Sequence, residues 1–204
     1  MFFYLKTQTI AQTLYEEAIR IYRDNAKFDP DLKLYLVHYL SAASMNDLAL
    51  GHISLRLKQD YNKSFVEIDK YYARWKCRAM ITLPIFDAWE AQLWGYVFNN
   101  YVESSVLLPR MSRDRTQLHM NRIRRRIDYA RLNCDERPIY NYELRWLRQI
   151  ALHRDYGLDR LVTAYIAGTS EKQMRDVFNV VYNAKELQKE ILQKGAFNVL
   201  SIEE

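Results

Sequence analysis

The chain has 204 residues, of which 49% are apolar, so it can bury a hydrophobic core and general disorder is excluded. With only five glycines and four prolines, few positions suit tight turns, and the composition favours helices over a turn-rich β architecture. Cys77 and Cys134 follow no metal or redox spacing. They predict two thiols in the cytoplasm or another reducing compartment, and their spacing leaves a disulfide open.

Neither a signal peptide nor a transmembrane segment is expected. The first residues are apolar but lack a basic region and a small-residue cleavage site. The least charged stretch, residues 80–108, has roughly the length of a membrane span, yet it contains Asp87, Glu90 and Glu103. Because carboxylates near a bilayer centre are costly, this stretch is expected to be a buried helix.

The spacing of the apolar residues predicts a succession of helices. In chain order they cover about residues 7–27, 31–43, 44–61, 64–82, 84–108, 114–132, 140–155, 158–167 and 170–194. Asp29-Pro30-Asp31 separates the first two helices and can cap the second. Ser64 with Glu67, and Ser170 with Gln173, have the spacing of a capping box.

The second and fifth predicted helices are rich in apolar residues and are expected to be central. Ser44 or Asn46 is expected to cap the third helix, whose apolar residues recur at helical steps: Leu50, Ile53, Leu57 and Tyr61. No repeat and no linker rich in Gly, Ser or Pro is present. We therefore expect an all-α fold, an irregular bundle of about seven to nine helices. It would form a single domain over residues 1–204, with a short flexible tail at about 196–204.

Arginines gather between residues 110 and 131, where eight of them and two aspartates give a local charge of +6. Since the whole chain carries +5, the remaining residues sum to −1. Guanidinium groups suit bidentate contacts with phosphate or carboxylate. An apolar seam runs along the predicted helix, formed by Met120, Ile123, Ile127 and Ala130. The opposite face is expected to carry Arg115, Arg122 and Arg126, with His119 and Tyr129 beside them.

Three interpretations of this helix remain open. The arginines can pair with nearby acidic residues on a solvated face, follow the phosphates of a nucleic acid, or clamp the carboxylates of an acidic protein partner. The aromatic and cationic residues of the 71–78 stretch suit base stacking or a protein interface, although an aromatic core with peripheral cations is commoner. The candidate binding residues are Arg110, Arg113, Arg115, Arg122, Arg125, Arg126 and Tyr129.

Catalytic motifs are scarce. There is no Gly-rich phosphate loop, no nucleophile elbow and no paired histidines at metal-ligand spacing, so neither a cofactor nor a metal site is expected. The spacing from Arg148 to His153 is similar to the Arg-x4–6-His motif of HEPN-type ribonucleases, which are all-helical and often dimeric. Arg113 with His119 also fits, whereas Gln149 stands where the motif favours Asn or Asp. The resemblance implies that the histidine handles a proton of the ribose 2′-hydroxyl while the arginine stabilises phosphate charge.

The favoured interpretation is a non-enzymatic binding or assembly component of a larger complex. Its Arg-rich helix would engage an acidic protein surface, since no recognition helix preceded by a short Gly-containing turn is present. Nucleic-acid binding through the same arginines is the first alternative, and a HEPN-like ribonuclease is the second. The sequence leaves the oligomeric state open. Every binding interpretation requires that the arginines be exposed.

Overall fold

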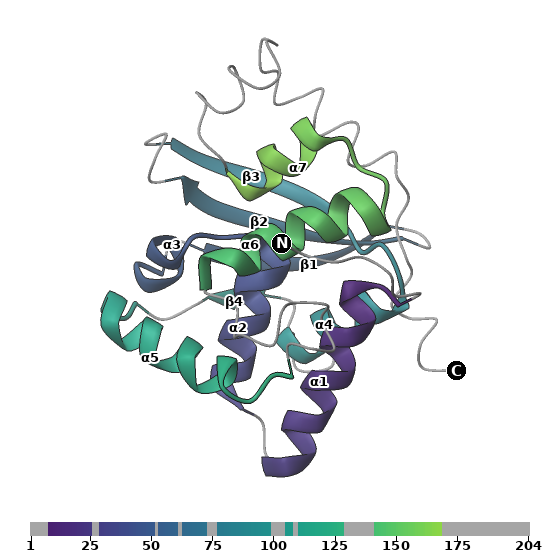
Figure 1. Cartoon of the computed structure of the whole chain (residues 1–204). Helices are drawn as coiled ribbons and strands as arrows, with labels where there is room; N and C mark the ends of the chain where they lie inside the picture. Colours follow the sequence, from purple (N-terminus) through teal and green to yellow (C-terminus); the bar gives the residue numbers. More distant parts are fainter. Residues whose placement is uncertain are drawn as a thin grey trace.

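A computed structural model describes residues 8–25, 29–51, 53–60, 63–72, 77–98, 105–107, 110–128 and 141–168, and all structural statements concern these residues. They form a mixed α/β fold in which helices surround an antiparallel sheet (Figure 1). The predicted all-α bundle is therefore wrong. The errors lie between residues 53 and 84, where strands replace the expected helices, and at residues 105–107, where a short strand replaces the end of the helix expected over 84–108.

The helices are α1 (Ile10–Asn25), α2 (Pro30–Ser41), α3 (Met45–Ala49), α4 (Ala88–Val97), α5 (Arg113–Arg124), α6 (Asn141–Ile150) and α7 (Arg160–Ala167). A π-helical segment, η1 (Ala151–Asp155), continues α6. Two predicted caps are confirmed. The Asp29 carboxylate accepts hydrogen bonds from the first backbone N–H groups of α2, and Ser44 forms a capping box with Asp47 at the start of α3.

The sheet contains β1 (Ile53–Asp60), β2 (Lys63–Tyr72), β3 (Cys77–Pro84) and the short β4 (Ser105–Leu107), in the order β3-β2-β1-β4. All neighbouring strands are antiparallel, and the register pairs Ile53 with Lys70 and Phe65 with Pro84. Buried side chains recur at every second position in the two central strands, as Leu55, Val66 and Ile68 illustrate. The period is thus that of a strand with one buried face.

The strands explain why three helix predictions failed. Ile53 and Leu57 fit helical steps, but the same segment alternates strictly between apolar and polar residues, and Leu55 between them is buried. Ser64, expected to cap a helix, is buried inside β2. Pro84 ends β3 instead of opening a helix, and β3 is an edge strand, where a missing N–H is tolerated.

The core lies between the sheet and the helices. In Figure 1, α6 and α7 lie over the sheet, while α2 runs away from it toward α1, α4 and α5. Residues 34–41 of α2 are all buried, and α2 contacts α4, α5 and α6, so its predicted central position is confirmed. The helices predicted over 140–155 and 158–167 are present as α6 with η1 and as α7. The helix predicted over 170–194 and the tail at 196–204 lie outside the described residues.

Candidate functional site

Helix α5 carries most of the predicted binding residues, and its sequence explains where it begins and which face it buries. Ser112 caps its N-terminus by accepting a hydrogen bond from the backbone N–H of Arg115 at 3.2 Å. Met120 and Ile123 of the predicted apolar seam are buried in the core, and so is Ile127 just beyond the helix. Ala130 of that seam lies outside the described residues. The apolar seam therefore turns the opposite face of α5 outward.

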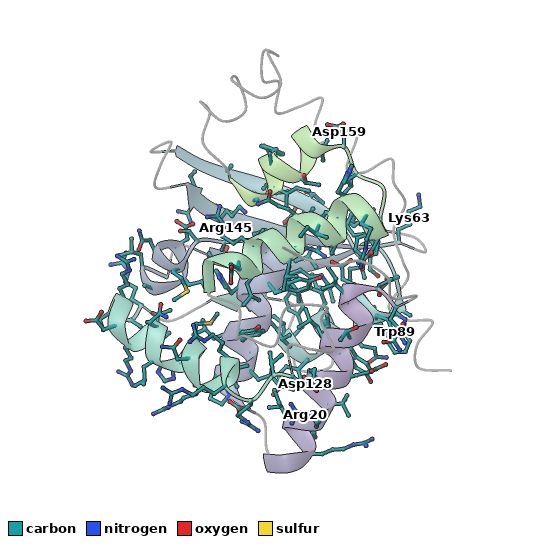
Figure 2. All side chains as sticks on the ribbon, viewed as in Figure 1. Arg20, Lys63, Trp89, Asp128, Arg145 and Asp159 are labelled. Carbon is teal, nitrogen blue, oxygen red and sulfur yellow. The ribbon has the colours of Figure 1, made fainter. Side chains whose placement is uncertain are left out.

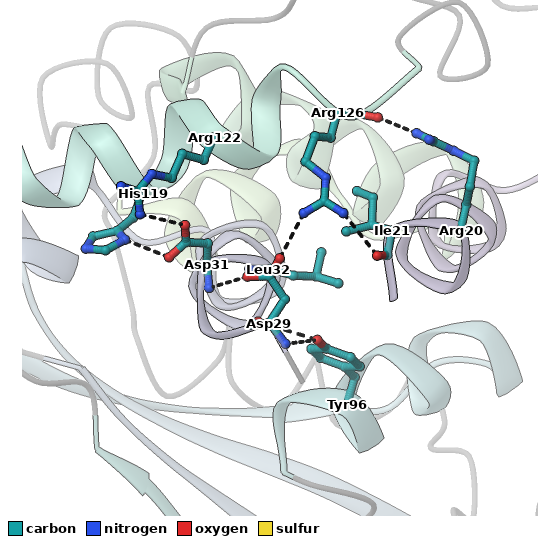
Figure 3. A network of polar contacts seen from close by, with 9 residues as sticks. All are labelled: Arg20, Ile21, Asp29, Asp31, Leu32, Tyr96, His119, Arg122 and Arg126. Carbon is teal, nitrogen blue, oxygen red and sulfur yellow. Dashed lines mark hydrogen bonds and ion pairs between the residues drawn. The ribbon is translucent and has the colours of Figure 1, made fainter. Parts of the chain in front are cut away.

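Two aspartates at the start of α2 hold α5 in place (Figure 3). Arg126 donates from Nη1 to Asp29 Oδ2 at 2.9 Å, and from Nη2 to the backbone carbonyl of Ile21 at 3.0 Å. Nδ1 of His119 lies 2.6 Å from Asp31 Oδ1, and Nη1 of Arg122 lies 3.5 Å from the other oxygen of this carboxylate. The Asp29-Pro30-Asp31 sequence thus begins one helix and binds another.

The C-terminal end of α5 is fixed to α1 as well. Arg20 donates a hydrogen bond to the backbone carbonyl of Arg126 and pairs with the buried Glu17 at 2.6 Å (Figure 3). The Glu17 carboxylate also accepts a hydrogen bond from the backbone N–H of Asp128 at 2.9 Å. These contacts join segments more than one hundred residues apart in the sequence, so α5 is held at its C-terminal end by side chains of α1 as well as α2.

The arginines of this region therefore differ in exposure, and Arg124 is half-buried. Arg126, with a side chain 30% exposed, is bound to Asp29 and to the backbone. The exposed arginines are Arg110, Arg113, Arg115, Arg122 and Arg125. Figure 2 shows the nitrogen-tipped side chains of α5 directed away from the body of the protein. The predicted face of Arg115, Arg122 and Arg126 is thus divided between solvent and fold.

An exposed leucine lies among these arginines. Leu118 is 52% exposed, and Arg115, Arg122 and Arg125 follow at positions −3, +4 and +7 from it. At 100° per residue these four side chains span about 80° of the helix surface. The α5 surface, defined here as Arg115, Leu118, Arg122 and Arg125, combines an apolar centre with three guanidinium groups. Sequence reasoning missed Leu118, although its place in the same row of three- and four-residue steps was visible.

The Arg148–His153 spacing does not form an open site. Arg148 is fully buried and pairs with the equally buried Glu90, and its guanidinium lies 5.5 Å from the ring centroid of Tyr39. Burial raises the pKa of the Glu90 carboxyl. His153 is exposed on η1, where its Nδ1 lies 2.7 Å from the backbone oxygen of Leu158. Arg148 is thus used inside the fold.

The second Arg–His spacing is also split. Arg113 is exposed at the first turn of α5, whereas His119 lies against Asp31. Neither spacing places both of its side chains on an open surface, so the geometry offers no support for the ribonuclease motif. Tyr129, the remaining predicted binding residue, lies outside the described residues.

One buried cation was not expected from the sequence. Lys70 of β2 is buried, and its Nζ donates to the carbonyl of Ser41 at 3.0 Å and to that of Ile166. Arg145 donates hydrogen bonds to the backbone carbonyls of Ala42 and Ala167, the residues that directly follow Ser41 and Ile166. Burial, with a smaller contribution from Arg145, lowers the pKa of Lys70 to about 7. These two cations satisfy carbonyls at the C-terminal ends of α2 and α7.

Comparisons with known proteins give no relative: no protein-family model matches the sequence, and no curated protein and no solved structure is significantly similar to it. No helix within the described ranges has the length and apolar character needed to cross a membrane. The described side chains also contain no group of three or more His, Cys, Asp or Glu arranged to hold a metal ion. The α5 surface is therefore the arrangement on which a functional proposal can rest.

Proposed function

We propose that this protein is a non-enzymatic binding or assembly component that engages an acidic protein partner through the α5 surface. One observation carries the proposal: Leu118 is half exposed in the middle of three exposed arginines. Interfaces between proteins are enriched in arginine and bury apolar side chains at their centre. Guanidinium groups around such a centre bind carboxylates by charge-assisted, often bidentate hydrogen bonds.

The distribution of charge supports an acidic partner. Asp29 and Asp31 already neutralise Arg126 and part of the Arg122 charge, but Arg115 and Arg125 remain exposed on the same face as Leu118. Electrostatic complementarity speeds association and excludes partners of the wrong charge. A surface of this kind is expected to select a protein that presents carboxylates around an apolar side chain.

The same surface is less suited to nucleic acid. Phosphate groups attract the arginines, but they offer nothing that would remove the Leu118 side chain from water. A surface evolved for a phosphate backbone gains affinity from cations and hydrogen-bond donors, and an exposed leucine at its centre adds none. Nucleic-acid binding is therefore the competing outcome that the experiment must be able to reveal.

The test is co-purification of the full-length tagged protein from its native extract, with and without nuclease treatment. Arg115→Glu is the informative variant, because a carboxylate in the first turn of α5 is compatible with the helix dipole and should leave the fold intact. Arg23→Glu, the same reversal of charge at an exposed position in the last turn of α1, is the control away from the α5 surface. Arg126→Glu is unsuitable because it would set a second carboxylate against Asp29.

We expect a protein partner that survives nuclease treatment, is lost with Arg115→Glu and is retained with Arg23→Glu. Loss of the partner on nuclease treatment would identify nucleic acid as the bridge and overturn the proposal. Retention of the partner by Arg115→Glu would show that another surface binds it. Circular dichroism of both variants checks that the helices are preserved.

A further inference from the structure

We infer that the partner segment recognised by the α5 surface is an acidic amphipathic helix, which places one apolar side chain on Leu118 and carboxylates one turn to either side. This inference rests on the proposed function and specifies the partner's form. Its first support is the axial spacing: Arg115 and Arg122 lie one turn before and one turn after Leu118. With a rise of 1.5 Å per residue, they stand about 4.5 Å and 6 Å from it along the helix axis.

A helical partner reproduces this spacing without distortion. On a helix, residues three and four positions from an apolar residue lie on its own face, at the same axial distances. Carboxylates at those positions can therefore meet Arg115 and Arg122 while the apolar residue covers Leu118. The next position of the row, Arg125, adds a further cation about 10.5 Å from Leu118. The surface thus suits a partner helix of at least three turns.

An extended partner fits the surface less well. Extended peptides gain much of their affinity from backbone hydrogen bonds to an open strand edge. Helix α5 offers no such edge, since its N–H and C=O groups are bonded along the helix and its first turn is capped by Ser112. A helix satisfies its own backbone and needs only side-chain contacts.

Helix α5 and the side chain of Arg122 are held in place before any partner arrives. Nη1 of Arg122 lies 3.5 Å from Oδ2 of Asp31, while 58% of the Arg122 side chain remains exposed. Arg126 and Arg20 fix the C-terminal end, and the buried seam fixes the face that points outward. Such preorganisation lowers the entropy lost on binding, so a short helix that presents few contacts can bind measurably.

The experiment measures peptide binding to the full-length protein by fluorescence anisotropy. The main probe is a synthetic peptide of about twenty residues, long enough for appreciable helicity, with a central Leu and Glu at positions −4, −3, +3 and +4 from it. Three further probes are a scrambled peptide of the same composition, polyglutamate and a single-stranded oligodeoxynucleotide. The variants are Leu118→Ser and, as control, Met80→Ser, which replaces a 61% exposed residue on β3.

We expect the amphipathic peptide to bind more tightly than the scrambled peptide and polyglutamate. Leu118→Ser should weaken it by about tenfold, as expected for losing a buried leucine contact, and Met80→Ser should not weaken it. Equal binding of all acidic probes, unaffected by Leu118→Ser, would overturn the helical partner but leave an acidic partner intact. The same conclusion follows if none of the acidic peptides binds while co-purification succeeds. Tighter binding of the oligodeoxynucleotide than of every peptide would overturn both proposals.

Discussion

Replacing Arg148 by Met should destabilise the protein strongly, because it leaves the Glu90 carboxylate buried without a counter-charge. Both side chains are completely buried, and the second Glu90 oxygen accepts a hydrogen bond from the backbone N–H of Phe86 at 3.0 Å. Methionine occupies much of the volume of the arginine stem, so the loss comes mainly from charge and not from a cavity. Breaking a buried ion pair by removing one partner costs about 3–5 kcal/mol, which is a large part of a typical free energy of unfolding.

The loss of stability in the Arg148→Met variant should be smaller at low pH. Burial raises the pKa of Glu90, and Arg148 opposes that shift. In the Arg148→Met variant the native Glu90 therefore holds its proton to a higher pH than the unfolded chain does. Its contribution to stability is complete in acid, below the unfolded pKa, and is lost as the pH rises toward the folded pKa. Because the pKa of Glu90 is already raised in the wild type and rises further without Arg148, the stability difference from the wild type should shrink as the pH is lowered to the point at which both native proteins hold this proton.

Urea unfolding followed by circular dichroism measures these differences. Arg78→Met is the matched control, since Arg78 pairs with Asp69 at 2.8 Å but is largely exposed and should contribute less than about 1 kcal/mol. The double variant Glu90→Gln/Arg148→Met should lose less stability than the sum of the losses of the two single variants, by about 1–3 kcal/mol. A loss for Arg148→Met no larger than that for Arg78→Met, or one that does not shrink in acid, would refute the reasoning.

Further predictions concern the other polar contacts of the interior. Because burial lowers the pKa of Lys70 from 10.5 to about 7 in the native protein, the unfolded chain binds the additional proton between these values, and the free energy of unfolding should rise there by about 1.4 kcal/mol per pH unit. In the Lys70→Met variant this rise should be smaller when urea unfolding is compared between pH 7 and pH 10. If the free energy of unfolding depends on pH as in the wild type, the lowered pKa of Lys70 is not the cause of the rise. Asp29→Ala removes both the cap of α2 and the Arg126 ion pair, so a loss of about 1–2 kcal/mol is expected in thermal unfolding. Asp29→Asn keeps the capping acceptor and should lose less; equal losses would mean that the cap contributes nothing.

Signals that depend on neighbouring residues could be predicted from the sequence. The cap formed by Asp29 and that formed by Ser44 each involve residues within three positions, so the chain itself contains the whole interaction. Helix ends at Gly157 and Gly168 were equally visible, because the positive φ angles of 67° and 65° that follow a helix favour glycine. The apolar seam of α5 follows from the helical period alone.

Only part of the sheet could be predicted from the sequence. In β1 the apolar residues Ile53, Leu55 and Leu57 alternate with polar ones, which indicates a strand, although Ile53 and Leu57 taken alone also fit a helical step. In β3 the exposed Met80 conceals the alternation, and in β2 the buried Lys70 does so. The small number of glycines does not exclude a β-hairpin. Strands β1 and β2 pair from Asp60 and Lys63 onward, and only two residues connect them.

The α5 surface shows how far a charge pattern can be interpreted without a structure. The cluster of arginines was evident in the sequence. Which arginines are exposed and which are bound within the fold was not, because Arg126 pairs with Asp29, 97 positions away in the chain. Local charge therefore overstated the face available to a partner. It also directed attention away from Leu118, which is apolar and yet lies at the centre of the exposed arginines. Charge identified the helix, and burial identified its face.

This division makes α5 a helix in which folding and binding are separable by residue. Asp29 and Asp31 neutralise the side of α5 that meets the body of the protein, and changes there act first on stability. Arg115 and Arg125 have exposed side chains, and changes there act first on the partner. Arg122 belongs to both groups, since it touches Asp31 while most of its side chain remains exposed. A substitution at Arg122 is thus expected to alter both properties, which is why the binding experiments rely on Arg115 and Leu118.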